Sequence, residues 1–261
     1  MIVLRTEREL ESLRGAGRVT GQLRTVARAA IRAGVATVDI DRAVREAIAA
    51  LGASSNFLGY HGFPATVCVS VNEEVVHGIP GDRRLADGDV VSVDLGAVWR
   101  GYHGDSAFTL CLGGAPDARV AELVEATEEA LWQGVAACRP GNHVGDISAA
   151  VEAVARRHGL GVVREFVGHG VGRAMHEDPQ VPNYGRAGTG ALLRRGMVLA
   201  IEPMFTLGED AVVVLDDGWT VVTRDRSLAA HFEHTIAVGD PPEVLTLEPE
   251  TARAVAGDGH G

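Results

Sequence analysis

The stretch VVSVDLGAVWRGYHGDSAFTL, residues 90–110, has the alternating apolar pattern of the two strands of a β-hairpin. Each predicted strand contains a carboxylate, since Asp94 lies among valines and Asp105 lies just before Ala107 and Phe108. Burying an ionised carboxylate costs free energy unless a cation contacts it. The hairpin therefore predicts a positive charge that is bound at its two acidic residues.

The composition is that of a globular protein with a strongly acidic balance. The chain has 261 residues, of which 46% are hydrophobic and 23% are charged, enough for one large domain or two modest ones. The net charge is −11, and all 24 basic residues are arginines. General nucleic-acid binding requires a positive surface. We therefore expect no direct binding of nucleic acid.

The N-terminus and the cysteines indicate the cellular compartment. The sequence MIVLRTEREL has too short an apolar run for a secretory signal, and no apolar stretch of the chain is long enough to span a bilayer. The three cysteines, Cys68, Cys111 and Cys138, are an odd number without CxxC spacing. Neither a disulfide framework nor a zinc knuckle is indicated. We expect a cytoplasmic protein that does not enter the membrane.

Helical and β-rich segments alternate twice along the chain. Residues 6–33 predict an amphipathic helix, a second helix ends at Gly52, and β-rich sequence follows. Helical sequence returns near residue 117 and is again followed by β-rich runs from about residue 162. The second helices of the two parts align without gaps at an offset of 107 positions, which places Gly34 on Gly141, Asp39 on Asp146 and Gly52 on Gly159. Either an internal duplication or shared helix-start chemistry explains these matches.

The repeated order predicts the architecture. We expect one domain over residues 1–250, made of two related α+β halves at about 5–112 and 117–240, with a flexible tail at 251–261. The strands of the two halves would meet in the middle. A cleft between such halves is a natural place for a site.

Two further acidic residues lie in apolar surroundings. Glu202 occurs within MVLAIEPMF and Glu233 within AAHFEHTIAV, while His169 and His176 lie among glycines in GHGVGRAMHEDP. Taken singly, each acid could face solvent on a half-exposed strand. Four such acids in four strands favour a cluster, whose mutual repulsion requires cations. The chain has no lysine, and no arginine lies close to these acids in their own strands. The pattern predicts a metal centre.

The types of ligand indicate the kind of metal centre. Carboxylates with one imidazole make a hard, oxygen-rich site, unlike the thiolate sets that bind structural zinc. Four carboxylates exceed what one catalytic ion needs, whereas two divalent ions roughly 3.5–4 Å apart would use all of them. Such a pair activates water and polarises a carbonyl, which predicts hydrolysis. Iron, manganese, cobalt and zinc all remain open as the native metal.

Five segments together resemble a known family. They are VCVSVNEEVVHGIP, VSVDLGAVWRGYHGDSAFTL, GHGVGRAMHEDPQVPNYG, AIEPMF and FEHTIAV, and they are similar to the methionine aminopeptidases of type I. The resemblance extends from about residue 5 to about residue 240. It implies the pita-bread (creatinase/aminopeptidase) fold, an α+β fold of two pseudo-symmetric halves with a central antiparallel sheet and outer helices.

The resemblance also implies an activity. A member of this family is a cytoplasmic, monomeric metallo-hydrolase that removes the initiator methionine from nascent proteins and peptides, most readily when the second residue is small. Its partners would be polypeptide N-termini, and a transient contact with the ribosome is compatible with that role. The expected cofactors are two divalent metal ions per chain.

The resemblance assigns the metal ligands and the general base. It implies that Asp94 binds one ion through both oxygens, that Asp105 and Glu233 bridge the two ions, and that His169 and Glu202 complete the shell of the other. Glu202 would also accept a proton from the water. The four acids that lie in apolar strands are thus the four carboxylate ligands that the resemblance implies, and the resemblance adds His169 as the imidazole.

The resemblance assigns the substrate contacts as well. His77 would contact the substrate near the scissile amide nitrogen, and His176 would hydrogen-bond the carbonyl and stabilise the developing oxyanion. The methionine pocket would be lined by Phe57, Tyr60, Phe63, Cys68, Met175 and Trp219. Ordinary core packing is the alternative for these six. His103 and His231 are candidates for orienting a metal ligand.

Two other functions remain in view. A proline-directed peptidase of the same fold, such as an aminopeptidase P or a prolidase, would usually carry a sizeable extra N-terminal domain. A non-catalytic binding protein of this fold would be expected to lose metal ligands and gain basic surface. The five intact ligand positions and the charge of −11 argue against the binding protein, and a single helix-rich segment before the first motif argues against the proline-directed peptidase.

Overall fold

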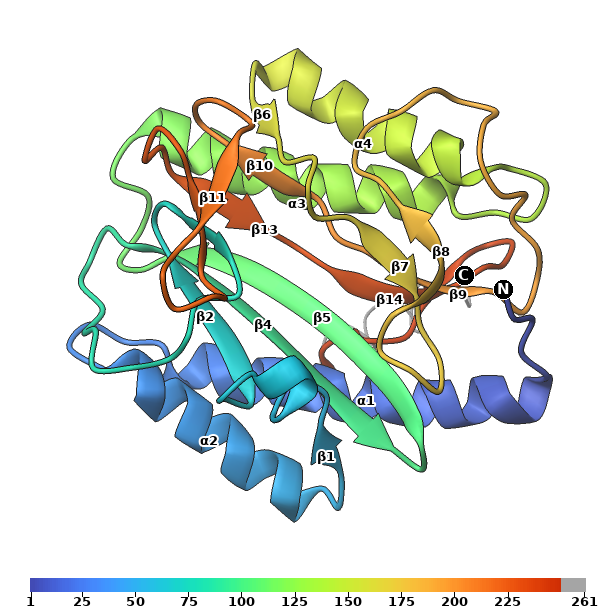
Figure 1. Ribbon diagram of the computed structural model, residues 1–261, viewed down its shortest axis with the longest axis horizontal. Coiled ribbons are helices and arrows are strands. Elements are labelled where there is room, and N and C mark those ends of the chain that lie inside the picture. The colour runs from blue at the N-terminus through green and yellow to red at the C-terminus, as the bar shows by residue number, and fades with distance from the viewer. Residues whose placement is uncertain (250–261) are drawn as a thin grey trace, which may run out of the picture.

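Four helices enclose the strands from two sides. The computed structural model describes residues 1–249. Figure 1 shows α1 (Glu7–Ala30) and α2 (Thr37–Ala50) on one side of the strands, and α3 (Ala118–Ala137) and α4 (Val144–His158) on the other. Among residues 1–249, none of the helices combines the length and the apolar composition that crossing a bilayer requires.

The first helix begins where its sequence supplies a cap. The Thr6 hydroxyl accepts the N–H of Glu9, and the Glu9 carboxylate accepts the N–H of Thr6 at 3.0 Å. This reciprocal pair satisfies two backbone donors that a helix start leaves free. Leu13 and Leu23 on the inner face are 0% exposed. The helix predicted over 6–33 is therefore confirmed, with slightly shorter bounds.

The two second helices begin in the same way. The Asp39 carboxylate accepts the N–H of Ala36, and the Asp146 carboxylate accepts the N–H of His143. A carboxylate in the first turn also favours the positive end of the helix dipole. The α2 and α4 helices both end just before the predicted glycine stops. The boundaries of the halves at 5–112 and 117–240 stay predictions, and the tail at 251–261 lies outside the described residues.

The predicted hairpin is confirmed as the core of one sheet. Strands β4 (Val90–Trp99) and β5 (Tyr102–Cys111) pair antiparallel in unbroken register. On its other edge β4 pairs with β1 (Ser54–Ser55) and β2 (Val67–Val71). The buried side chains of this hairpin pack on α1, which runs alongside both strands.

The remaining strands form one five-stranded sheet and two small ones. The larger sheet has the order β15 (Glu243–Val244), β14 (His234–Ala237), β9 (Val198–Ile201), β7 (Gly168–Gly170) and β8 (Glu177–Val181). One small sheet contains β6 (Gly161–Val162), β10 (Met204–Thr206) and β13 (Ala229–His231). The other contains β3 (Glu74–Val76), β11 (Val212–Val214) and β12 (Val221–Thr223).

Strands of the two parts of the chain meet where β5 approaches β14. The Glu233 N–H donates to the Ala107 carbonyl at 2.9 Å, and the Ala107 N–H donates back at 3.2 Å. Next to them, the Asp105 N–H donates to Thr235 Oγ1 at 2.9 Å, and that hydroxyl donates to the Asp105 carbonyl at 2.8 Å. Asp105 and Glu233, which are 128 positions apart in the sequence, are thereby held side by side.

Candidate active site

The period of the strands places the two hairpin carboxylates on one face. Asp94 lies opposite Ala107 in the β4–β5 ladder, and Asp105 lies opposite Gly96. Side chains alternate between the faces of a sheet, so Asp94 and Asp105 are diagonal neighbours on the same face. A Cβ at position 96 would lie only 2.8 Å from Asp105 Oδ1, so any larger residue there would clash with this carboxylate.

All five predicted ligands line one cavity of about 160 Å³. Asp105, His169 and Glu233 each offer a ligand atom, and these atoms lie within 4.8 Å of one another. His169 Nε2 is 3.5 Å from Glu202 Oε1, and Asp94 shares the same cavity wall. Asp105 and Glu233 are only 3% and 2% exposed. Residues from five separate strand regions thus converge on one spot.

His169 has the orientation of a metal ligand. Its Nδ1 lies 2.9 Å from the Gly170 carbonyl, which can only accept a hydrogen bond. The Nδ1 position therefore carries the proton, and the lone pair of Nε2 faces the carboxylates. A metal-binding histidine is usually held by a hydrogen bond of this kind at its other nitrogen.

Three carboxylate oxygens of the cluster have no hydrogen-bond partner. Asp94 Oδ1, Asp105 Oδ1 and Glu233 Oε1 are buried, and among residues 1–249 nothing donates to them. Buried polar atoms are nearly always paired, so unpaired oxygens of three residues that line one cavity require a ligand. Divalent cations fit this donor set of carboxylates and one imidazole.

One buried cation approaches the cluster, and it was not predicted. Arg24 of α1 is 6% exposed and donates to Ser106 Oγ at 2.7 Å and to the Ala107 carbonyl at 2.9 Å. Burial and the neighbouring acids raise the pKa of Glu233. The charge of Arg24 lowers this pKa, but by less. Within the described part of the chain, no arginine forms an ion pair with the four acids. The sequence feature that could have predicted this buried cation is the position of Arg24 on the inward, apolar face of α1.

Desolvation and crowding shift the titration of the cluster. Burial raises the pKa of Asp94 to about 7. Burial, and then the charges of Asp94 and Glu202, raise the pKa of Asp105 well above its ordinary value, while burial and Asp94 raise that of Glu202. Burial lowers the pKa of His169 to about 3. Without a cation, the cluster retains protons that metal binding would displace.

His77 and His176 lie at the rim of the same cavity. The ring centroid of His176 is 4.2 Å from that of His169, and the Tyr60 hydroxyl oxygen is 2.7 Å from His176 Nδ1. The His77 ring packs edge-on against Phe166 at 5.4 Å, and burial lowers its pKa to about 4. Both imidazoles are thus placed beside the carboxylates without taking part in the cluster itself.

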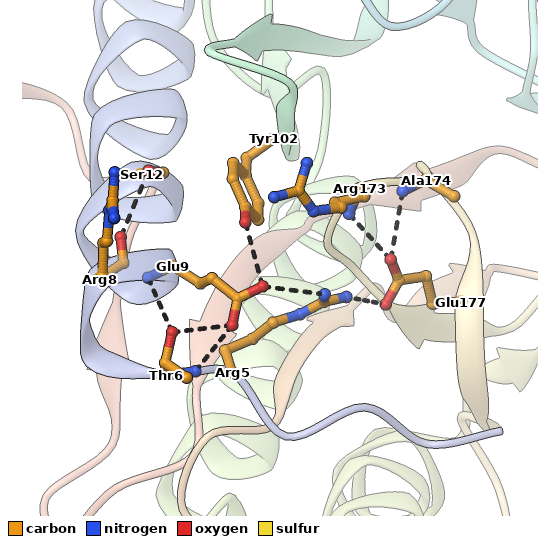
Figure 2. A network of polar contacts seen from close by, with 9 residues as sticks. All are labelled: Arg5, Thr6, Arg8, Glu9, Ser12, Tyr102, Arg173, Ala174 and Glu177. Carbon is orange, nitrogen blue, oxygen red and sulfur yellow. Dashed lines mark hydrogen bonds and ion pairs between the residues drawn. The ribbon is translucent and has the colours of Figure 1, made fainter.

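A polar network anchors the backbone next to His176. Figure 2 shows the Glu177 carboxylate between two sets of donors: Arg5 on one side, and the N–H groups of Arg173 and Ala174 on the other. The N–H distances are 2.9 and 3.2 Å. Arg5 directly precedes the cap of α1, so the network ties the His176 loop to that helix.

The six side chains predicted for the methionine pocket form one apolar cluster. Phe57 and Phe63 meet edge-on at 6.4 Å, and Phe63 meets Trp219 at 5.0 Å. Cys68, Met175 and Tyr60 complete the cluster, and all six line the cavity that holds the carboxylates. Phe166 and Val167 also line the cavity and were not predicted. A short apolar pair in the sequence does not show whether its side chains line a cavity or pack in the hydrophobic core.

Of the two histidines considered as orienting residues, only one lies beside the cluster. His231 is 1% exposed, and its Nε2 is 3.9 Å from Glu202 Oε2. In the described residues neither of its ring nitrogens has a hydrogen-bond partner. His103 instead contacts Asn56 Oδ1 at 3.0 Å.

Comparison with known proteins identifies sequence relatives over almost the whole chain. The profile of metallopeptidase family M24 matches residues 11–240. Methionine aminopeptidase 1 of Bacillus subtilis is 48% identical over 91% of this chain and 96% of its own length. The methionine aminopeptidase of Clostridium perfringens is 45% identical over 95% of this chain and 99% of its own.

Solved structures agree with the sequence relatives. The methionine aminopeptidase of Thermotoga maritima superposes with a TM-score of 0.92 at 46% identity, covering 95% of this chain and all of its own. The prolidase of Pyrococcus furiosus superposes with a TM-score of 0.76 at 22% identity, and 65% of that longer chain is covered. The second similarity shows the fold alone. The α+β pita-bread fold expected from the sequence is thereby confirmed.

Proposed function

The chain belongs to metallopeptidase family M24, as a relative of its methionine aminopeptidases, and from this premise we propose that it removes N-terminal methionine from peptides and nascent proteins. One observation carries the proposal. Five metal-ligand candidates and an apolar pocket that suits a thioether side chain line the same cavity.

The family uses divalent metal, and we propose two ions per chain. Asp94 would bind one ion, Asp105 and Glu233 would bridge both, and His169 and Glu202 would complete the other shell. The orphaned oxygens of Asp94, Asp105 and Glu233 support this assignment. When bound, a pair of such ions lowers the pKa of water and polarises a carbonyl. Iron, manganese, cobalt or zinc satisfies the donor set.

The chain's own residues supply proton transfer and orientation. Glu202 has a raised pKa and lies at the cluster, which suits a group that accepts a proton from the attacking water. His176 would donate a hydrogen bond to the carbonyl oxygen as negative charge develops there. His77, which packs against Phe166 and Trp219 in the same cavity, would contact the nitrogen of the scissile amide.

The apolar cluster would hold the methionine side chain. Phe57, Phe63 and Trp219 offer aromatic edges, and Cys68 and Met175 offer polarisable sulfur. Burial raises the pKa of the Cys68 thiol, which keeps it neutral and apolar. We infer a cytoplasmic monomer that acts on emerging polypeptides with a small second residue. Any contact with the ribosome would be transient.

A peptide series tests the activity. Purified protein is stripped with chelator, reloaded with single metals and assayed for the free amino acid released from Met-Ala-Ser, Leu-Ala-Ser, Met-Leu-Ser and Ala-Pro-Ser. We expect methionine from Met-Ala-Ser with metal only, and at least about tenfold less turnover on Leu-Ala-Ser, since a misfit in an apolar pocket costs about 1–3 kcal/mol. Cleavage of Ala-Pro-Ser without cleavage of Met-Ala-Ser would favour a proline-directed peptidase instead.

A further inference from the structure

His176 must be held in one tautomer, which we call its ring state, if it is to donate a hydrogen bond to the substrate. A neutral imidazole carries its proton on one nitrogen only, and the partner of the other nitrogen decides which one. The structure gives His176 Nδ1 one side-chain partner, the Tyr60 hydroxyl oxygen at 2.7 Å. Within residues 1–249, Nε2 has no hydrogen-bond partner, and the ring lines the cavity beside His169.

We propose that Tyr60 is a positioning residue for His176: its O–H donates to Nδ1, which holds the imidazole as the Nε2–H form that faces the substrate carbonyl. This role differs from that of a wall of the methionine pocket. It rests on the proposed function for its effect on turnover, but the ring state itself can be measured without any substrate.

The chemistry of the pair favours this direction of donation. A phenol O–H is a good donor, and the unprotonated imidazole nitrogen is the better acceptor of the two. A phenol ionises only at about pH 10, so it keeps its proton at neutral pH. The reverse donation, from Nδ1–H to the phenol oxygen, would leave Nε2 as an acceptor. An acceptor repels a developing oxyanion.

The loop that carries Tyr60 is built to hold it in place. Gly59 (φ 82°), His61 (φ 47°) and Gly62 (φ 90°) surround it with left-handed backbone. A non-glycine residue in this region costs on the order of 1–3 kcal/mol and persists only where its surroundings enforce it. The Tyr60 N–H donates to the Phe57 carbonyl, and the Phe63 N–H donates to the Tyr60 carbonyl, both at 2.9 Å.

Two other rings pack against the His176 ring. The ring centroid of Tyr60 is 5.4 Å from that of His176, and the ring centroid of His169 is 4.2 Å from it. The following residue, Glu177, fixes the backbone through Arg5 (Figure 2). With the ring held in this way, the Tyr60 hydroxyl decides which ring nitrogen carries the proton.

The test removes the hydroxyl and keeps the ring. With Tyr60→Phe we expect kcat and kcat/KM on Met-Ala-Ser to fall together by about tenfold, the value of one hydrogen bond of about 1.4 kcal/mol. KM, metal content and the preference for Met-Ala-Ser over Leu-Ala-Ser should be unchanged. Tyr184→Phe is the matched control, because the Tyr184 ring packs under Arg164 outside the cavity. It should leave kcat unchanged.

Nitrogen-15 NMR of histidine-labelled wild-type protein reads the ring state directly. We expect a protonated Nε2 and an unprotonated Nδ1 for His176, with loss of that single form in Tyr60→Phe. A protonated Nδ1 in the wild type would overturn the proposal. So would a Tyr60→Phe variant with kcat within twofold of wild type and an altered methionine preference. If the wild type releases no methionine at all, the proposed function fails, and the NMR result still decides the ring state.

Discussion

Alanine at Asp105 or at Glu233 should reduce the release of methionine from Met-Ala-Ser at least about a thousandfold, equivalent to about 4 kcal/mol of transition-state stabilisation. Both carboxylates are almost fully buried and lie where β5 meets β14. Each would contact both ions of the proposed pair. Metal content, measured by atomic emission after gel filtration, should fall from two ions per chain in parallel with the activity.

His77→Ala is the control for these variants. His77 lines the same cavity but lies outside the carboxylate cluster, so this variant should keep its metal and lose turnover only. Full activity in Asp105→Ala or Glu233→Ala would contradict the assignment of bridging ligands. Loss of metal in His77→Ala would show that His77 has a different role from the one proposed.

The metal-free protein should lose stability as the pH rises from about 6.5 to 8.5, and divalent metal should remove that loss. In the unfolded chain the carboxyls ionise near pH 4, whereas in the folded cluster burial raises the pKa of Asp94 to about 7 and raises the pKa values of Asp105, Glu202 and Glu233 well above their ordinary values. The folded state therefore binds more protons in this range, and its free energy of unfolding falls with rising pH.

The expected effect is large enough for thermal unfolding to detect. Raising the pKa of one carboxyl from 3.8 to about 7 is worth on the order of 4 kcal/mol, which is present at low pH and is lost progressively as the pH rises from about 4 to about 8. About 1 kcal/mol of this is lost above pH 6.5 for Asp94 alone, which is roughly 2–4 °C in melting temperature for a chain of this size. The other three acids, whose pKa values are also raised, add to this loss. Bound Mn²⁺ would hold the carboxylates ionised, so the melting temperature at pH 8 should rise and its decline with pH should disappear.

The pH range above 6.5 distinguishes the effect of the acids on the free energy of unfolding from that of the histidines. Burial lowers the pKa of His169 and of His231 to about 3, so these groups destabilise the folded state only below about pH 6.5. Glu233→Gln is the control, because it removes one buried charge at nearly equal volume and should flatten the metal-free profile above pH 6.5. A metal-free wild type whose melting temperature is constant over that range would contradict the electrostatic account.

Residues that belong to periodic strands could be predicted from the sequence. Asp94 and Asp105 break the apolar pattern of a hairpin, and a buried carboxylate demands a cation wherever the strand lies. The helix starts near Asp39 and Asp146 could also be predicted from the sequence, because a capping interaction involves only residues that are close in the chain. These signals need no knowledge of the tertiary structure.

Contacts between distant segments could not be predicted in this way. Arg24 lies on the inner stripe of its helix, but the sequence does not show that this stripe meets Ser106 and Ala107 of β5. The hydrogen bond between Tyr60 and His176 joins residues 116 positions apart. His231 lies beside Glu202 only because β13 pairs with β10. Each of these depends on sheet topology, which a single sequence does not specify.

Anomalous diffraction from crystals grown with Mn²⁺ tests the central claim most directly. The claim is that the carboxylates converge because two divalent ions hold them. The account predicts two anomalous peaks inside the cavity, both in contact with Asp105 and Glu233, one also with Asp94 and the other also with His169 and Glu202. Peaks only elsewhere on the protein, or none in crystals of protein that releases methionine, would contradict it.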